Sequence, residues 1–146
     1  MPYQRMTDDE VRRFITADPP HTGKLATVRA DGRPHVAPVW YAVDDDGSIV
    51  FTTGEDTVKG KNLARTRYAA MSIDDERPPF SFVVFEGPVE LSSDDMDQLG
   101  RWATILGGRY MGEDTAEAFG ERNAVPGELV ARLRPEKVTS AKDLAD

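Results

Sequence analysis

The stretch VFTTGEDTVKGKNLARTRYA, residues 50–69, reads as a strand, a tight acidic loop and a short basic helix. The apolar residues that lead into Thr52 and Thr53 predict the strand. Thr57 is placed to cap the helix, because its side-chain oxygen can accept a hydrogen bond from an amide of the first turn. The other strand patterns are joined mostly by hairpins, so this helix is the one crossover beside the predicted sheet.

Positive charge gathers in this helix, although the whole chain has a formal net charge of -8. Residues 57–67 contain no acidic residue and four basic ones: Lys59, Lys61, Arg65 and Arg67. Free amides at a helix start, a lysine ammonium and nearby hydroxyls together favour an anion. We interpret the junction as a phosphate site, and the alternative is a basic face that binds only water.

The composition is that of an ordinary globular chain, with 146 residues of which 39% are hydrophobic and 30% charged. This length predicts one domain, residues 1–146. No apolar run approaches the ~20 residues of a membrane helix, and MPYQRMTDDEVRRF lacks the apolar core of an export signal. The absence of cysteine excludes disulfides and thiolate metal sites and fits a cytoplasmic enzyme. A pI near 4.8 argues against nucleic acid as a partner.

Six strand patterns predict a mainly β protein with helices, built on a small antiparallel barrel. They lie at residues 24–30, 34–43, 48–53, 68–73, 80–91 and 128–133. Asp31-Gly32 is a strong hairpin signal, and Gly87-Pro88 predicts a bend inside the fifth strand. The polar tail, residues 139–146, is expected to be frayed.

Helices are predicted on both sides of this strand region. Thr7 and Glu10 have the spacing of a capping box, which predicts a helix from Thr7 to about Ala17. Later helices are expected at residues 93–106, ended by Gly107-Gly108, and near residues 114–123.

Two features of the strands suggest a planar ligand. Pro34 and Pro38 remove ladder donors, so residues 34–40 are expected at a sheet edge with free backbone groups. The alternative is an edge strand that proline protects from aggregation. Aromatic side chains in the strands can stack on a ring, although most strand aromatics are core: Trp40, Tyr41, Phe80, Phe82 and Phe85.

No side-chain catalyst can be assigned from motifs. Neither His21 nor His35 has the spacing of a triad or a metal site, and HExxH and GxSxG are absent. The acidic clusters fall at turns and helix starts without EF-hand spacing. The catalytic residues therefore stay unknown, no metal is expected, and the chemistry would come from a cofactor.

Four segments taken together resemble the pyridoxamine 5'-phosphate oxidase-like flavin-binding split barrels. The resemblance is strongest to the branch of small deazaflavin-dependent oxidoreductases that use coenzyme F420. The segments are GKLATVRADGRPHVAPVWY (23–41), IVFTTGEDTVKGKNLAR (49–65), DDERPPFSFVVFEGPVEL (74–91) and VPGELVARLRPEKV (125–138). The resemblance implies a six-stranded antiparallel split β-barrel that forms a homodimer, with cofactor sites between the subunits.

The resemblance also implies which residues bind the cofactor. Contacts to phosphate and the cofactor side chain are implied at Thr52, Thr53, Thr57, Lys59 and Asn62. The backbone of Ala37, Pro38, Val39 and Trp40 would cradle the ring, and Phe80 and Phe82 would approach from the second chain. Lys61, with Arg65 and Arg67, would suit the polyglutamate tail of F420. The chain departs from the family where Thr66-Arg67-Tyr68 replaces a common Asp-Pro-Arg, and where Thr57 replaces a basic residue of some relatives.

The implied function is an F420H2-dependent reductase that transfers a hydride to an unsaturated organic substrate. One alternative is an FMN-dependent oxidoreductase on the same barrel, and another is a non-catalytic cofactor-binding protein. The sequence ends in AKDLAD rather than in the basic substrate motif of true pyridoxamine phosphate oxidases. This difference argues against a pyridoxine phosphate substrate.

Overall fold

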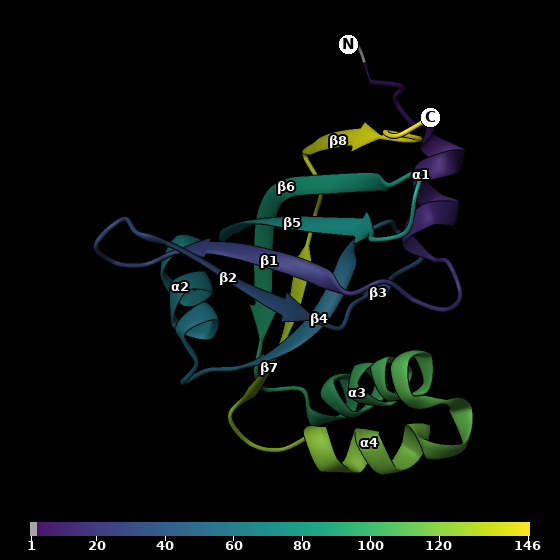
Figure 1. The fold of residues 1–146 in the computed structure, drawn as a ribbon. Coiled ribbons are helices and arrows are strands. Elements are labelled where there is room, and N and C mark those ends of the chain that lie inside the picture. Colours follow the sequence, from purple (N-terminus) through teal and green to yellow (C-terminus); the bar gives the residue numbers. More distant parts are fainter. Residues whose placement is uncertain (1–2) are drawn as a thin grey trace.

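The structure, a computed structural model, describes residues 3–146 (Figure 1). Within these residues the strands are β1 Gly23–Val28, β2 Pro34–Val39, β3 Ala42–Val43, β4 Ile49–Gly54, β5 Tyr68–Asp75, β6 Ser81–Ser92, β7 Glu128–Leu133 and β8 Lys137–Ala141. The helices are α1 Asp8–Ile15, α2 Val58–Thr66, α3 Met96–Met111 and α4 Ala116–Asn123, with a short 3-10 helix, η1 Glu113–Thr115.

The sheet is antiparallel and curls back on itself. Its strand order is β2-β1-β5-β6-β7-β4-β3, and β8 adds to β6. The two ends of this path, β2 and β3, are separated in the chain by Trp40 and Tyr41 alone. The two ends of the sheet are therefore joined by the chain itself, without a ladder of hydrogen bonds between β2 and β3. This open seam confirms the expected split barrel (Figure 1).

The corner of the barrel lies in β6, where the sequence predicts a bend. β6 pairs with β5 as far as Pro88 and with β7 from Val89 onward. Figure 1 shows the strand turning sharply between these two partners. A Cβ atom on Gly87 would lie 2.0 Å from the carbonyl oxygen of Arg134, so only glycine allows the chain after β7 to pass this closely.

Two apolar clusters stabilise the fold. The first fills the barrel with inward-facing strand side chains such as Leu25, Phe51 and Ile73, which are fully buried. The second joins α3 to the outside of β4 and β7 through residues that include Trp102 and Val130. The α3–α4 hairpin therefore covers one side of the barrel, as Figure 1 shows.

The helix starts follow the sequence closely. At α1 the capping box forms as predicted, with the amide of Glu10 donating to Thr7 Oγ1 and the amide of Thr7 donating to Glu10 Oε1. At α2 the predicted cap also forms, because Gly60 N donates to Thr57 Oγ1 at 3.0 Å.

The expected end of α3 is wrong. The helix continues through Gly107-Gly108 to Met111. A Cβ atom on Gly107 would lie 2.5 Å from Phe119 Cβ, so the glycines let α4 approach α3 rather than end it. Helix-helix contact outweighs the weak local preference of glycine for helix ends.

Two expectations about strands also need correction. Residues 34–43 form two strands instead of one, because β2 pairs with β1 whereas β3 pairs with β4. The tail is not frayed, since β8 pairs with β6 and Leu144 N donates to Phe80 O at 3.0 Å. β8 satisfies backbone groups of β6 that would otherwise form an open edge.

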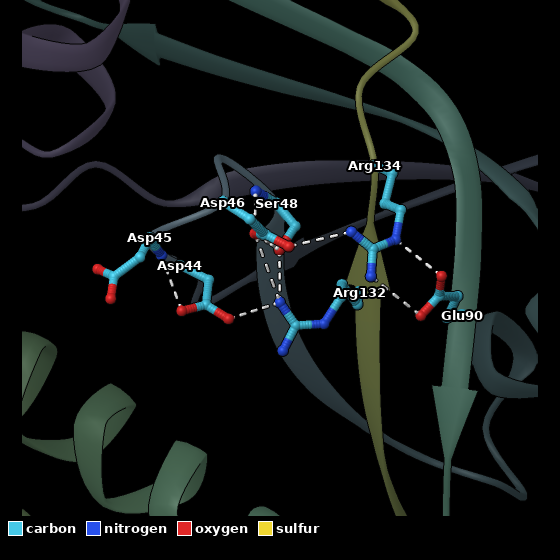
Figure 2. Close-up of polar contacts among 7 residues, drawn as sticks. All are labelled: Asp44, Asp45, Asp46, Ser48, Glu90, Arg132 and Arg134. Carbon is cyan, nitrogen blue, oxygen red and sulfur yellow. Dashed lines mark hydrogen bonds and ion pairs between the residues drawn. The ribbon is translucent and has the colours of Figure 1, made fainter.

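A network of ion pairs ties the β3–β4 turn to β6 and β7 (Figure 2). Arg132 Nη1 lies 2.7 Å from Asp44 Oδ2, and Arg134 Nε lies 2.7 Å from Glu90 Oε1. Arg134 Nη1 also lies 3.0 Å from Asp46 Oδ2. The hydrogen bonds from the two arginines lower the pKa of the Asp44 and Glu90 carboxyls. Their contribution to stability is therefore present above the ordinary pKa values of these carboxyls and is lost as the pH falls through the lowered values.

Among residues 3–146 no helix is both long enough and apolar enough to cross a bilayer.

Candidate functional site

A hollow of about 180 Å³ lies where β2, β4, α2 and the α3–α4 hairpin meet. Five residues of the sequence-based site line it: Pro38, Val39, Trp40, Thr52 and Lys59. The hairpin supplies three more, which sequence reasoning did not identify: Ala103, Leu106 and Asn123. The fold thus brings the β2 edge and the start of α2 to one place, although they are some twenty residues apart in the sequence.

The loop before α2 is fixed by hydrogen bonds to its own backbone. Thr57 Oγ1 donates to Gly54 O at 2.7 Å and accepts from Gly60 N at 3.0 Å. Thr53 Oγ1, on a buried residue, lies 3.2 Å from Thr57 Oγ1. These two hydroxyls therefore shape the loop, and the hydroxyl on the hollow itself is that of Thr52.

The first turn of α2 offers free hydrogen-bond donors. Within residues 3–146, the amides of Val58 and Lys59 have no hydrogen-bond partner. Gly60 keeps this turn close to the end of β4, since a Cβ atom there would lie 2.1 Å from Gly54 O. Two amides at the positive end of a helix, together with the Lys59 side chain, form an arrangement that attracts an anion.

Asn62 and Arg65 connect α2 to β1 rather than to the hollow. Asn62 is 3% exposed, and its Nδ2 donates to Thr27 Oγ1 at 3.0 Å. Its Oδ1 accepts from Arg65 Nη2 at 3.0 Å, and the same guanidinium donates to Val28 O. Every polar atom of the Asn62 side chain thus has a partner inside the protein.

An acidic residue beside Lys59 was missed from the sequence. Glu128, the first residue of β7, pairs with Gly54 at the end of β4. Burial raises the pKa of the Glu128 carboxyl, and the positive charge of Lys59 opposes this effect. A carboxylate here competes with any bound anion for the field of Lys59. Its position at the start of a predicted strand gave no signal of this proximity.

The indole of Trp40 is held by the α3–α4 hairpin. Its ring stacks on Tyr110 with centroids 5.2 Å apart and an interplanar angle of 6°, and it meets Phe119 edge-on at 6.0 Å. The Tyr110 hydroxyl donates to His21 O at 2.6 Å and accepts from Tyr41 N at 3.3 Å. The aromatic wall of the hollow is therefore rigidly positioned.

The remaining site residues of the sequence-based set lie outside the hollow. Ala37 precedes Pro38 on β2, and Lys61 is exposed on α2. Phe80 is 41% exposed and Phe82 is half-buried at the start of β6, which lies on the α1 side of the barrel, away from α2 (Figure 1). A single chain does not bring these two rings to the hollow. In the part of the chain that the structure describes, no group of three or more His, Asp or Glu could hold a metal ion.

The sequence profile of the pyridoxamine 5'-phosphate oxidase family matches residues 7–142. The chain belongs to this family. The match covers every strand of the barrel and the three helices that line the hollow, α2, α3 and α4.

Two curated proteins are similar to part of the chain. The pyridoxine/pyridoxamine 5'-phosphate oxidase of Burkholderia multivorans is 36% identical over 121 residues, which cover 70% of this chain and 55% of that protein. The 5a,11a-dehydrotetracycline/5a,11a-dehydrooxytetracycline reductase of Streptomyces rimosus is 38% identical over 56 residues, covering 36% of this chain and 39% of that protein. The chain spans about half the length, or less, of these relatives.

Solved structures share the fold. The conserved hypothetical protein Rv2991 of Mycobacterium tuberculosis superposes with a TM-score of 0.80 at 26% identity, covering 97% of this chain and 89% of that one. A structure described as an F420 reductase gives a TM-score of 0.64 at 28% identity, covering 82% of this chain and 90% of the other. An FAD-binding protein of Mesorhizobium loti, with a TM-score of 0.69 at 19% identity over 96% of this chain and 97% of its own, supports the fold alone.

Proposed function

We propose that this protein is an F420H2-dependent oxidoreductase that reduces an unsaturated organic substrate. When bound, the deazaflavin would supply the hydride, and the protein would bind, orient and shield the reactants. The observation that carries this proposal is the hollow, where free amides and Lys59 at the start of α2 adjoin the aromatic and apolar wall built on Trp40. A phosphate-bearing planar ring needs both features.

The residues present fit such a cofactor. Lys59, the free amides of the first turn of α2 and the Thr52 hydroxyl would hold its phosphate. The ring would lie along β2, which is an edge strand of the sheet. Pro34 and Pro38 lie on the same side of this strand and have no amide, so that side is the unpaired one. On this edge the carbonyl oxygen of Pro34 accepts from Arg29 Nη1 at 3.0 Å, and those of Val36 and Pro38 remain to meet a ligand.

We also propose that the site is completed by a second copy of the chain. Ligand pockets usually measure about 300–1,000 Å³, whereas this hollow measures about 180 Å³. Val28 and Val36, on the outer face of β1 and β2, are 47% and 67% exposed. A partner that covers this apolar face would form a homodimer and could bring its own Phe80 and Phe82 to the cofactor.

The choice of F420 over FMN rests on two likenesses. The Streptomyces rimosus protein is named as a reductase, and one structural neighbour is described as an F420 reductase. Lys61 is exposed on α2 and remains available for an anionic tail, whereas Arg65 is engaged with Asn62 and Val28. The alternative is an FMN-dependent oxidoreductase, which the longer match to the Burkholderia multivorans oxidase favours.

The test is to titrate the purified protein with F420 and with FMN in parallel and to measure each dissociation constant from the change in cofactor fluorescence. We expect F420 to bind more tightly, and we expect F420H2 to be consumed with some members of a panel of enones and quinones. A protein that carries FMN and ignores F420 would establish the alternative. Tight F420 binding without turnover of any acceptor would indicate a cofactor-binding protein instead.

A further inference from the structure

We propose that Asn123 recognises the ring edge of the ligand in the hollow, with its side-chain amide hydrogen-bonded to an adjacent carbonyl and N–H group. This assignment rests on the proposed function and adds a binding residue from the α3–α4 hairpin. It predicts that the hairpin contacts the ring of the ligand, while α2 binds its phosphate.

Asn123 is a half-buried polar residue whose side chain has no partner. It lines the hollow with Thr52 and Lys59. Its backbone oxygen accepts from Val125 N at 3.1 Å. Within residues 3–146 its side-chain amide makes no hydrogen bond, and its polar atoms are open to solvent rather than buried. An amide that is open to the hollow can be hydrogen-bonded by water, or by a ligand that displaces the water and replaces its hydrogen bonds. Asn62, by contrast, is satisfied at both ends inside the protein.

The position of Asn123 is fixed by close packing of α4 on α3. One turn before it, a Cβ atom on Gly120 would lie 2.0 Å from Thr104 Oγ1, so the two helices are in direct contact there. Phe119 packs against Gly107 and also meets the ring of Trp40. The same contacts that orient the aromatic wall therefore hold the end of α4, and the backbone of Asn123 is positioned in advance of binding.

The surroundings of Asn123 select a neutral, planar group. Apolar side chains line the hollow beside it: Val39, Trp40, Ala103 and Leu106. An anion would be met by the donors of α2 and Lys59, on a different element. A carboxamide offers an acceptor and donors side by side, which complements a carbonyl next to an N–H on one ring edge. The pyrimidinedione edge of flavins and deazaflavins has this pattern.

The proposal can be tested by removing either side of the contact. The variants are Asn123→Ala and Asn123→Leu, with Glu121→Ala as a control on the exposed face of α4. The ligands are FMN or F420, whichever the unmodified protein binds, and the same molecule methylated at the ring N–H. Dissociation constants are measured by fluorescence quenching, and melting temperatures confirm that each variant folds.

We expect both Asn123 variants to bind the natural ligand about three- to tenfold more weakly, as for the loss of one neutral hydrogen bond. The Glu121 variant should bind unchanged. Methylation should weaken binding to the unmodified protein by a similar factor and have little further effect on the Asn123 variants. Equal affinities across all proteins would overturn the assignment and leave the proposed function intact. If the unmodified protein binds neither FMN nor F420, the proposed function fails, and this inference fails with it.

Discussion

Lys59 is the side chain on which the anion site depends most. Among residues 3–146 it is the one cation that lines the hollow, next to the free amides of its own turn. Lys59→Ala should weaken binding of F420 or FMN by about tenfold to a hundredfold, the ~1.5–3 kcal/mol of a hydrogen bond to a charged group. Isothermal titration calorimetry measures the change.

Lys61 provides a matched control for this substitution. It carries the same charge on the same helix but is exposed and does not line the hollow. Lys61→Ala should leave FMN affinity unchanged and weaken F420 binding a few-fold, if the anionic tail of F420 passes over this face. A Lys59 variant that binds as tightly as the Lys61 variant would remove Lys59 from the site.

Glu128 should make anion binding depend on pH. Burial raises the pKa of its carboxyl, so its charged form is disfavoured in the folded protein. A raised acid pKa contributes stability below the unfolded value, and this contribution is lost as the pH rises through the folded value. Loss of the negative charge beside Lys59, by protonation or by Glu128→Gln, should therefore tighten phosphate binding a few-fold.

The measurement is the dissociation constant of FMN or F420 between pH 5 and 8. The unmodified protein should gain more affinity toward pH 5 than Glu128→Gln does, because protonation of the ligand's own phosphate affects both proteins alike. Parallel pH profiles for the two proteins would show that Glu128 does not act on the ligand.

At the scale of elements, the sequence predicts well what is decided locally. The capping residues Thr7 and Thr57 and the bend at Gly87-Pro88 are correct, because each depends on neighbours within a few positions. Five residues on or beside β2, β4 and α2 that local patterns and the family resemblance suggested line one hollow, and their role in binding stays a prediction. Asn123 and Glu128 were not, because only the tertiary fold brings α4 and β7 beside α2.

Glycine in α3 shows why the remaining elements were harder to predict. Gly107 looks like a helix end but serves the contact with α4. The same helix contains Gly100, around which nothing lies within 4 Å of an added Cβ atom. Both glycines lie inside one helix, and only the tertiary contact of Gly107 with Phe119 explains its role.

This difference gives a prediction with an internal control. Gly107→Ala places a Cβ atom 2.5 Å from Phe119 Cβ and should destabilise the protein by about 1–3 kcal/mol. Gly100→Ala should stabilise it by up to ~1 kcal/mol, because alanine favours a helix interior. Urea unfolding gives both values, and equal effects of the two substitutions would contradict the observed packing.

At the scale of the whole molecule, the hollow lies between the barrel and the α3–α4 hairpin. The barrel supplies β2, β4 and the start of α2, and the α3–α4 hairpin closes the hollow from outside (Figure 1). The hairpin is anchored on the barrel by its own apolar cluster. The side that the hairpin leaves open is the side on which we propose the second chain.

The proposed dimer predicts that a charge on the uncovered face affects assembly and cofactor binding together. Val36→Asp places a carboxylate on a strand residue that is 67% exposed. Burial of this charge between two chains would be costly, so the variant should sediment as a monomer of 16.1 kDa and bind the cofactor more weakly.

Val138→Asp is the control, since this strand valine is 50% exposed on β8 and lies outside the proposed face. It should sediment as a dimer with unchanged affinity. An unmodified protein that is monomeric and still binds its cofactor fully would show that one chain forms the complete site.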